Sequence, residues 1–498
     1  MPSAAFATLG CKVNQYETQR ILDDFEARGF AITEFNQPAD VYVINSCSVT
    51  QAAERKSRQM ARKASRQSPG ALVVLTGCFG EMAGIRGEEI DEAAIVVPNR
   101  EKLQTLSHLL RAYPRLETDL QTQPKPVVRP PARRTRATIK VQDGCNVFCA
   151  FCSIPQTRSS MVSRPMDELV AEAERLAASG CREIVITGVL VGAYGQDGFV
   201  PTPVGEVAFG QDGQDETGWE KSRPDLADLL LQLAETPGLQ RVRLSSIEPT
   251  QVTNRLLDAF ASQPKLCRHL HIPLQSGDSA VLAAMNRPYD QAFYLDRCRE
   301  AHARIPDLAI TSDIMVGFPG EDRAAFESTL CVAREACFAR SHLFRYSPRP
   351  NTPAATLPDQ VPDAVKEERA KELAALCAVT QQRFIRRFIG RELEVLVEGK
   401  ERSDDRMEPG RDDGRERAAA LRSAETRLLS GYTSNYIRVQ LTGGSHLVGR
   451  VARVRLLEPA SDGAIGEVVF GQDEQDERDE RDERDEQDGQ DGGDGDDS

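Results

Sequence analysis

The chain has 498 residues, too many for one ordinary domain, and with 40% hydrophobic residues it can form about two to four domains with sizeable cores. Its formal charge of -14 falls mostly on residues 471–498, which hold fifteen Asp and Glu against three Arg, so the near-neutral remainder does not exclude an RNA partner. No long uncharged apolar run and no secretion signal is visible, so we expect a cytoplasmic protein without a membrane partner.

Residues 1–120 alternate short apolar runs with stretches of helical periodicity. Candidate strands are 4–10, 41–46, 71–77 and 93–99, and candidate helices are 14–29 and 51–67. Strands separated by helices favour right-handed crossovers, and therefore a parallel α/β sheet. A Pro- and Arg-rich linker at 121–136 then predicts a domain boundary.

Residues 137–375 repeat the strand–helix alternation and predict a second α/β domain. The candidate strands are 137–142, 182–189, 241–246, 269–275, 309–317 and 341–347. Six consecutive units of this kind predict an incomplete (β/α) barrel. In such barrels the functional residues lie at the carboxyl ends of the strands.

A helical segment at 363–389 leads into a third predicted domain at 388–470. Alternating apolar and polar residues at 391–399, 431–441 and 446–459 predict the strands of a small all-β barrel. The whole chain is therefore expected to be an α/β multidomain protein with a C-terminal β barrel.

Three polar segments interrupt these patterns. They are inserts at about 196–223 and 401–426 and the acidic tail at 471–498, which is predicted to be disordered. Residues 205–216 nearly duplicate 466–477, differing at two positions. Because such sequences cannot bury enough apolar surface to fold alone, we interpret them as solvated insertions and a tail.

Twelve cysteines in a long chain of this type favour metal or redox chemistry over a disulfide framework. Half of them lie in apolar or helical contexts and are predicted to be small buried residues: Cys181, Cys267, Cys298, Cys331, Cys337 and Cys377. The other six form two sets.

The first set, Cys145, Cys149 and Cys152, has C-x3-C-x2-C spacing and follows the first strand of the predicted barrel. Three thiolates on one loop can hold three irons of a [4Fe–4S] cluster and leave the fourth iron open for S-adenosylmethionine. Electron transfer from this cluster would cleave a C–S bond of S-adenosylmethionine and generate a radical, with Phe151 packing against the adenine. The alternative is a structural zinc site, which usually requires four ligands.

The second set, Cys11, Cys47 and Cys78, is dispersed, but each cysteine follows a candidate strand of the N-terminal sheet. Parallel strands end at one edge of a sheet, so the three thiols are expected to converge there. This arrangement predicts a second three-cysteine [4Fe–4S] cluster. Its open iron would hold a sulfur atom for insertion into a substrate. The alternative is three unrelated buried cysteines.

These motifs resemble the methylthiotransferase family of radical S-adenosylmethionine enzymes. The opening TLGCKVNQYE at 8–17 is similar to the branch that acts on N6-threonylcarbamoyladenosine at position 37 of tRNA. Residues 271–289 and 313–321 also resemble family signatures, and the region around 431–439 resembles a TRAM domain, a small RNA-binding barrel. One departure is Ser159, which stands where the family motif IP-x-x-RG has glycine.

The resemblance implies that Cys145, Cys149 and Cys152 are catalytic ligands of the S-adenosylmethionine cluster and that the dispersed cysteines bind an auxiliary cluster. Two molecules of S-adenosylmethionine would be used per product, one as methyl donor and one as radical source. The product would be the 2-methylthio derivative of the tRNA nucleoside. The resemblance implies an electron donor such as a flavodoxin or ferredoxin, but it does not identify the sulfur source.

Two alternative functions use the same motifs. In the first, the chain is a methylthiotransferase that acts on isopentenyladenosine in tRNA or on an aspartate of a ribosomal protein. A non-catalytic RNA-binding iron–sulfur sensor would bind a cluster without cleaving S-adenosylmethionine, and it leaves the open-iron loop unexplained.

Several residues at predicted strand ends are candidates for the S-adenosylmethionine pocket. They are Thr187, Gly188, Ser245, Glu248, Gln275 and Gly317, together with Phe151. Ordinary turn chemistry is the alternative for each. His271, also near a strand end, is predicted to be a hydrogen-bonded structural residue.

Two basic surfaces are candidates for RNA contact, and a solvated helix face and a soluble linker are the alternatives. The first comprises Arg55, Lys56, Arg58, Arg62, Lys63 and Arg66, and the second Arg129, Arg133, Arg134 and Arg136. In the C-terminal barrel, Tyr432 and Tyr436 are candidates for stacking on bases or for packing within the barrel.

Overall fold

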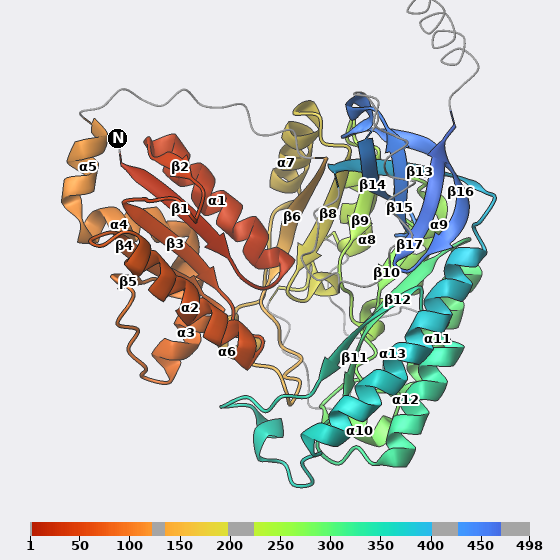
Figure 1. Cartoon of the computed structure of the whole chain (residues 1–498). Coiled ribbons are helices and arrows are strands. Elements are labelled where there is room, and N and C mark those ends of the chain that lie inside the picture. The colour runs from red at the N-terminus through yellow and green to blue at the C-terminus, as the bar shows by residue number, and fades with distance from the viewer. Residues whose placement is uncertain (1, 122–134, 198–223, 401–426, 470–498) are drawn as a thin grey trace, which may run out of the picture. The chain divides into compact units, whose positions relative to one another are not determined.

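The computed structural model describes residues 2–121, 135–197, 224–400 and 427–469 (Figure 1). The chain divides into two compact units, residues 1–381 and 382–498. Apart from a few residues at their edges, the predicted linker, the two polar inserts and the acidic tail lie outside the described residues. Among the helices of the described ranges, none combines the length and apolar character needed to cross a membrane.

The first unit opens with the predicted parallel sheet, in the order β2-β1-β3-β4-β5. Its strands are β1 (Ser3–Thr8), β2 (Ala31–Thr33), β3 (Val41–Ser46), β4 (Leu72–Gly77) and β5 (Ile95–Val96). The edge strand β2 was not predicted, because it is only three residues long and carries little periodicity. Helices follow the strands: α1 (Lys12–Arg28), α2 (Gln51–Gln67), α3 (Cys78–Ile85), α4 (Thr105–Ala112) and α5 (Pro114–Gln121).

Both faces of this sheet are covered by helices. Val41 and Val43 pack with Phe25 of α1, whereas Tyr42 and Ile44 pack with residues of α2 and α3. Successive side chains of a strand point to opposite faces, so a strand that is buried on both sides is apolar throughout. The continuous apolar run Val41–Ile44 of β3 follows from this, and the strand ends in the buried polar residues Asn45 and Ser46 beside Cys47.

The remainder of the first unit is the incomplete barrel. Its strands are β6 (Arg136–Asp143), β7 (Val162–Ser163), β8 (Glu183–Gly188), β9 (Arg241–Leu244), β10 (His269–His271), β11 (Ala309–Val316) and β12 (Arg340–Arg345). They form a sheet β7-β6-β8-β9 and a sheet β10-β11-β12, and a parallel bridge between Ser246 and His271 joins β9 to β10. Only the short edge strand β7 is antiparallel to its neighbour among the strands of these two sheets.

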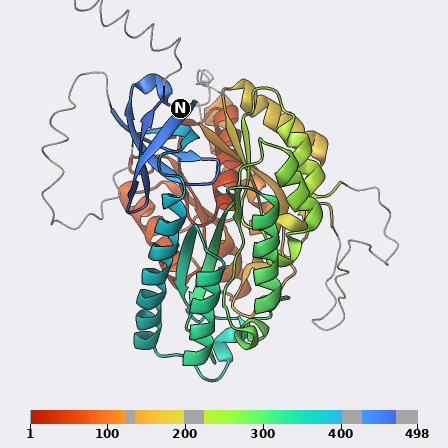
Figure 2. The same cartoon turned by 90° about the vertical axis from the view of Figure 1, so that its right-hand side faces the viewer.

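Helices cover the outer face of these strands, as the yellow-green to green ribbons of Figure 2 show. The longer ones are α7 (Met166–Ala178), α8 (Leu226–Ala234), α9 (Asn254–Ser262), α11 (Gln291–Arg304) and α12 (Arg323–Glu335), and the shorter ones are α6 (Ile154–Thr157) and α10 (Ser279–Ala284). Strand residues such as Ile186 and Val242 share one buried core with helix residues such as Leu229 and Leu257.

A buried ion cluster closes the amino-terminal end of the barrel. Glu183 is fully buried, and its carboxylate lies 2.7 Å from Arg243, 2.9 Å from Arg136 and 3.8 Å from Arg241. Burial alone would raise the pKa of Glu183, but the charges of Arg243 and Arg136 lower it to about 2. Arg136 was a candidate for RNA contact, and this interpretation is wrong because its guanidinium is a structural partner of Glu183.

The Glu183→Gln variant is expected to lose about 3–5 kcal/mol of unfolding free energy, because it leaves buried arginines without their carboxylate. Since the folded pKa lies below the ordinary value of about 4.3, this contribution is present above that pH and is lost as pH falls through the folded pKa. Urea denaturation measures the loss. Glu174→Gln, on the exposed face of α7, is the control and should shift stability by less than about 0.5 kcal/mol. An equal effect of the two variants would contradict this assignment.

The second unit is a closed five-stranded barrel in the order β13-β14-β15-β17-β16. Helix α13 (Asp363–Arg386) leads into β13 (Glu392–Lys400), β14 (Arg427–Thr433), β15 (Arg438–Gly443), β16 (Val451–Ala460) and β17 (Gly463–Val468). The predicted all-β barrel is therefore present, and only the details of its strands differ from prediction.

Two of these details correct the sequence analysis. The run 431–441 is not one strand but belongs to the β14–β15 hairpin, which turns at Tyr436 with a φ of 64°. The hydroxyl of Thr433 accepts a hydrogen bond from the backbone N–H of Ile437 (2.9 Å). In the turn, the side-chain oxygen therefore takes the place of a backbone carbonyl as the acceptor. Residues 463–468, which lie within the predicted domain but outside its candidate strands, form β17.

Candidate active site

The dispersed cysteines follow three neighbouring strands of the N-terminal sheet. Cys11 follows β1 and precedes α1, Cys47 follows β3, and Cys78 is the first residue of α3 after β4. Because β1, β3 and β4 are adjacent and parallel, the three residues lie at one edge of the sheet, as predicted. Cys47 and Cys78 are buried, Cys11 is exposed, and all three are free thiols.

Two glycines allow the backbone to approach these cysteines closely. Gly10 has a φ of 94°, and a Cβ at this position would lie 2.7 Å from Sγ of Cys47. Gly77 has a φ of 92°, and a Cβ there would lie 2.4 Å from the carbonyl oxygen of Ser46. Any side chain at either position would be strained and would also collide with the neighbouring cysteine loop.

Asn14 holds two of the cysteine loops together. Its Nδ2 donates hydrogen bonds to the carbonyl oxygens of Leu9 (2.9 Å) and Ser46 (3.0 Å), each of which lies next to or near a cysteine. Asn45 in turn donates to the carbonyl oxygen of Asn14 (3.0 Å). The sequence analysis missed Asn14. The available signal was its position in the TLGCKVNQYE motif, one helical turn after Cys11.

The C-x3-C-x2-C loop follows β6 and is anchored from several sides. The backbone N–H of Cys145 donates to the carbonyl oxygen of Arg158 (3.2 Å), and that of Ala150 donates to Met285 (2.9 Å). Asn286 Nδ2 donates to the carbonyl oxygens of Val147 (3.2 Å) and Phe148 (2.9 Å). These anchors fix the loop that carries all three cysteines.

Arg287 is the cation that contacts this loop directly. Its side chain is almost fully buried, and Nη1 lies 3.0 Å from Sγ of Cys149. Its other terminal nitrogen bonds to Glu248, and its guanidinium lies 5.0 Å from the ring centre of Tyr289. The sequence analysis missed Arg287, although it lies within the family-like segment 271–289. Glu248, a candidate for the S-adenosylmethionine pocket, is therefore a direct partner of a residue that contacts Cys149.

Burial favours the protonated thiol at four of the six cysteines, Cys47, Cys145, Cys149 and Cys152, because it raises their pKa. Burial raises the pKa of Cys145 to about 12 and that of Cys152 to about 11, and it raises the pKa of Cys47 to about 11. Backbone N–H groups lie near two of the sulfurs, Val49 at 3.4 Å from Cys47 and Ile154 at 3.5 Å from Cys152. Buried free thiols with amide donors and a cation nearby suit an anionic iron–thiolate group, which binds with loss of the thiol protons.

Within the described part of the chain, no three His, Cys, Asp or Glu side chains converge on a single metal ion. An iron–sulfur cube spreads three thiolates over three different irons, so its ligands stand farther apart than those of one ion. The two cysteine sets therefore fit a cluster by their residue types, their loops and the nearby cations.

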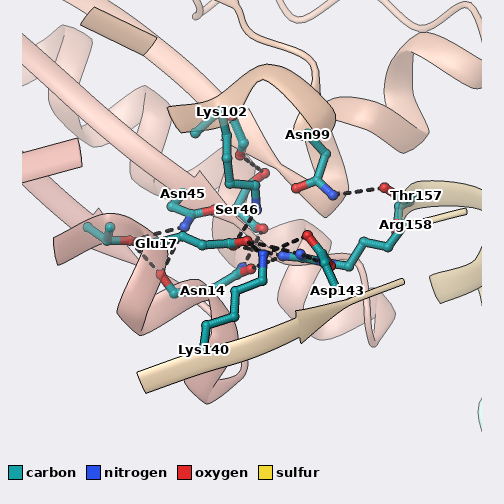
Figure 3. Close-up of polar contacts among 12 residues, drawn as sticks. Asn14, Glu17, Asn45, Ser46, Asn99, Lys102, Lys140, Asp143, Thr157 and Arg158 are labelled. Atoms are coloured by element: carbon teal, nitrogen blue, oxygen red, sulfur yellow. Dashed lines mark hydrogen bonds and ion pairs between the residues drawn. The ribbon is translucent and has the colours of Figure 1, made fainter. Parts of the chain in front are cut away.

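A buried ion network connects the two loops (Figure 3). Glu17 of α1 is 2% exposed, and its carboxylate lies 2.7 Å from Lys102, 2.6 Å from Lys140 and 2.8 Å from Arg158. Arg158 also donates to Asn14 Oδ1 (3.1 Å), while its carbonyl oxygen accepts from Cys145. Arg158 thus bonds to Asn14, which holds the Cys47 loop, and to Cys145, the first cysteine of the C-x3-C-x2-C loop.

The charge state of Glu17 follows from these neighbours. Burial alone would raise its pKa, but the charges of Lys102 and Arg158 lower the pKa well below its ordinary range. The carboxylate therefore stays ionised and holds three cations from two domains of the first unit. Sequence analysis did not predict this network, because its members lie on elements far apart in the chain.

The other candidates for the S-adenosylmethionine pocket lie in different structural settings. Thr187 and Ser245, at the ends of neighbouring strands, are joined by a 3.2 Å hydrogen bond. Gln275 has a φ of 63°, and Phe151 packs near Phe318 with ring centres 6.4 Å apart. Two glycines of the set are in crowded surroundings: a Cβ at Gly188 would lie 3.1 Å from Gln142, and one at Gly317 would lie 2.3 Å from Lys366.

His271 makes the contacts of a structural residue. Its Nδ1 lies 2.9 Å from the hydroxyl of Thr311, and its Nε2 lies 3.3 Å from the carboxylate of Asp313. These bonds join β10 to β11, as expected of a hydrogen-bonded structural histidine.

The candidate RNA surfaces are partly engaged in contacts within the chain. On α2, Arg58 pairs with Glu88, and Arg62 pairs with Glu92 at 2.6 Å. Exposed cations of the same helix are Arg55, Lys56, Lys63 and Arg66. In the second unit Tyr432 and Tyr436 stack on one another, with ring centres 5.0 Å apart. Arg129, Arg133 and Arg134 lie outside the described residues.

Of the six cysteines predicted to be small buried residues, four are buried. The other two, Cys331 and Cys337, are exposed, and for these the prediction is wrong. Cys331 lies on α12, where a helical position does not by itself imply the buried face.

Comparison with known proteins gives two matching family models. Residues 139–330 match the radical SAM superfamily, where SAM is S-adenosylmethionine, and residues 3–97 match a family described as uncharacterized protein family UPF0004. A solved structure with a similar fold is the radical S-adenosylmethionine methyltransferase TsrM from Kitasatospora setae. It is 14% identical, with a TM-score of 0.45, and the match covers 71% of this chain and 77% of TsrM.

Curated relatives cover nearly the whole chain. The threonylcarbamoyladenosine tRNA methylthiotransferase MtaB of Bacillus subtilis is 34% identical over 94% of this chain and 97% of its own length. The protein of the same name from Chlamydia pneumoniae is 37% identical over 78% of this chain and 85% of its own. That from Thermotoga maritima is 31% identical over 93% and 96%. The chain therefore belongs to the MtaB family of tRNA methylthiotransferases, within the radical SAM superfamily.

Proposed function

We propose that this protein transfers a methylthio group to C2 of N6-threonylcarbamoyladenosine at position 37 of tRNA, using radical SAM chemistry. The observation that carries the proposal is the pair of three-cysteine sets on loops that Arg158 and Asn14 connect. Generating a radical requires only one cluster with an open iron. A second set beside the first is what insertion of sulfur requires.

The chain's own residues have separate tasks in this proposal. Cys145, Cys149 and Cys152 hold the cluster that binds S-adenosylmethionine, and Cys11, Cys47 and Cys78 hold the auxiliary cluster. When bound and reduced, the first cluster supplies the electron that cleaves S-adenosylmethionine. The residues that line the S-adenosylmethionine pocket are Phe151, Thr187, Gly188, Ser245, Glu248, Gln275 and Gly317.

Arg287 and Asn286 serve the first cluster without binding it. The guanidinium of Arg287 donates toward the Cys149 sulfur and so favours its thiolate form. Asn286 fixes the backbone around Phe148, whose φ of 51° places a non-glycine residue in the left-handed region. A strained loop that is held from outside keeps its three sulfurs in place before any ligand arrives.

Binding of the tRNA substrate is assigned to the closed β barrel of the second unit, which we propose is a TRAM domain. A flavodoxin or ferredoxin is the proposed electron donor. We place the reaction in the cytoplasm, where the tRNA substrate is found.

The experiment that tests the function is an anaerobic reaction of the reconstituted enzyme with three substrates in parallel. These are tRNA carrying N6-threonylcarbamoyladenosine, tRNA carrying isopentenyladenosine, and the ribosomal protein substrate of the related enzymes. Mass spectrometry of nucleosides and peptides should find the methylthio group only on the first. Modification of either other substrate instead would overturn the proposed substrate, and cluster binding without S-adenosylmethionine cleavage would overturn the proposed activity.

Removing the acidic tail by truncation after Phe470 is expected to leave turnover within a few-fold of the full chain. Strand β17 ends at Val468, so the truncation retains the whole barrel, and low-complexity acidic sequence rarely packs against a core. Initial rates of methylthiolation compare the two proteins. A complete loss of turnover in a truncated protein that still binds iron would show that the tail takes part in the reaction.

A further inference from the structure

One short segment contacts both the C-x3-C-x2-C loop and the helix that follows Cys47. After β12 the chain continues through residues 348–354, and the carbonyl oxygen of Pro348 accepts a hydrogen bond from Gln51 Nε2 (3.1 Å) at the start of α2. On its other side, the N–H of Ala354 donates to the carbonyl oxygen of Ala150 (2.9 Å), between Cys149 and Cys152. Gln156 Nε2 donates to the carbonyl oxygen of Asn351 (2.6 Å). The segment is therefore fixed to the C-x3-C-x2-C loop and to the start of α2, four residues after Cys47.

Arg349 lies within this segment, and its guanidinium has an unused donor. Its Nε atom is buried and makes no hydrogen bond with any residue that the structure describes. A buried N–H of an arginine without an acceptor is costly, so it indicates a partner that the protein chain does not provide. Glu54, the carboxylate within electrostatic reach, bonds instead to Arg86 at 3.1 Å.

The charges around Arg349 come from both cysteine sets. Burial lowers the pKa of Arg349, and the thiolate forms of Cys152 and Cys47, which cluster binding would produce, oppose this effect. Cys152 belongs to the C-x3-C-x2-C loop and Cys47 to the dispersed set. One guanidinium is therefore within electrostatic reach of sulfurs from both proposed clusters.

We propose that Arg349 is a positioning residue that donates a hydrogen bond from Nε to a sulfur anion, hydrosulfide or methanethiolate, held on the open iron of the auxiliary cluster. This inference rests on the proposed function, because it requires the auxiliary cluster. A guanidinium is suited to the task since it is always charged and its donors are fixed in one plane. Hydrogen bonds between charged groups are about twice as strong as neutral ones. Arg349 would thus position the sulfur that the auxiliary cluster carries.

The test measures sulfur binding rather than turnover. Reconstituted full-length enzyme is saturated with S-adenosylmethionine without reductant, so that the open iron of the first cluster is occupied, and radiolabelled methanethiolate is added in anaerobic equilibrium dialysis. The Arg349→Gln variant is expected to bind methanethiolate about tenfold more weakly, the loss of one charge-assisted hydrogen bond. Arg349→Lys should recover part of the affinity. Arg345→Gln, an exposed arginine at the end of β12, is the matched control and should bind like the wild type.

The outcomes separate this inference from the proposed function. Equal methanethiolate affinity in wild type and Arg349→Gln, at equal iron content, would overturn the role of Arg349 and leave the proposed function standing. A wild-type enzyme that carries two clusters but binds no methanethiolate would overturn the sulfur-carrying cluster, and the role of Arg349 with it. If Arg349→Gln does not retain iron, Arg349→Lys decides at normal iron content. An affinity below that of Arg345→Gln supports a hydrogen bond donated by the guanidinium, and an affinity equal to that of Arg345→Gln overturns it.

Discussion

The Cys11/Cys47/Cys78→Ala variant is expected to lose all methylthiolation while it still cleaves S-adenosylmethionine when reduced. The three residues lie at the edge of the N-terminal sheet, and their loops are separate in sequence from the C-x3-C-x2-C loop, so the first cluster keeps all of its ligands. Liquid chromatography with mass detection measures 5′-deoxyadenosine and the methylthio nucleoside in one reaction. The expected result is 5′-deoxyadenosine within a few-fold of wild type and no modified nucleoside.

Cys331→Ala is the control for this experiment, because Cys331 is an exposed free thiol on α12, outside both cysteine sets. It should leave both products unchanged. Methylthio nucleoside formed by the triple variant at the wild-type rate would contradict the assignment of the dispersed cysteines. Loss of both products, with the iron content of one cluster retained, would instead show that S-adenosylmethionine cleavage depends on the auxiliary set.

Glu17→Gln is expected to cause a large loss of unfolding free energy. This substitution keeps the size of the side chain but leaves Lys102, Lys140 and Arg158 without their shared carboxylate. Removing one partner of a buried ion pair costs about 3–5 kcal/mol, and urea denaturation of the apoprotein should show a loss of that order. Glu26→Gln near the end of the same helix is the control, expected to shift stability by less than about 0.5 kcal/mol.

The pH dependence of this loss has a defined sign. The folded pKa of Glu17 is lowered below the ordinary value of about 4.3, so the carboxylate stabilises the fold above that pH. Its contribution falls as pH drops through the folded pKa, and the difference between wild type and Glu17→Gln should shrink in acid. A difference that grows as pH falls below about 4, or one that is absent at pH 7, would contradict the role of this network.

Prediction from sequence succeeded where a local pattern carries the information. A cysteine directly after an apolar run, as with Cys47 after VYVINS, identifies a strand end, and parallel strands bring such ends together. The C-x3-C-x2-C spacing is likewise local. Both sets could therefore be placed on their loops before the structure was known, and the parallel sheet, the incomplete barrel and the β barrel followed from periodicity.

Prediction failed where a contact joins distant elements or where a conformation overrides propensity. Arg158, Arg287 and Arg349 follow α6, α10 and β12 respectively. The first two lie in family-like segments, but hydrophobic periodicity does not indicate which distant groups their guanidinium groups contact. The β14–β15 turn was missed because Tyr436 adopts a left-handed conformation that usually favours glycine. Strand β17 was not predicted because the acidic sequence begins almost directly after it.

The missed arginines share a physical cause. Buried arginines are placed by their ion pairs with residues of other elements, such as Glu17 for Arg158 and Glu248 for Arg287, and not by hydrophobic periodicity. A sequence pattern reports which face of an element is apolar, but it does not report which distant carboxylate or sulfur a cation will meet. The proposed cluster ligands could therefore be identified from the sequence, whereas the residues that position their loops could not.

The proposed insertion of sulfur requires that this chain holds two separate three-cysteine clusters. Anaerobic reconstitution, with iron analysis beside electron paramagnetic resonance of the reduced sample, tests it on wild type and on a Cys145/Cys149/Cys152→Ala variant. The expected result is about eight irons per wild-type chain and about four in the variant, which keeps one cluster signal. About four irons in wild type and none in the variant would contradict the proposal, because the dispersed cysteines would then hold no cluster and the proposed insertion of sulfur would have no carrier.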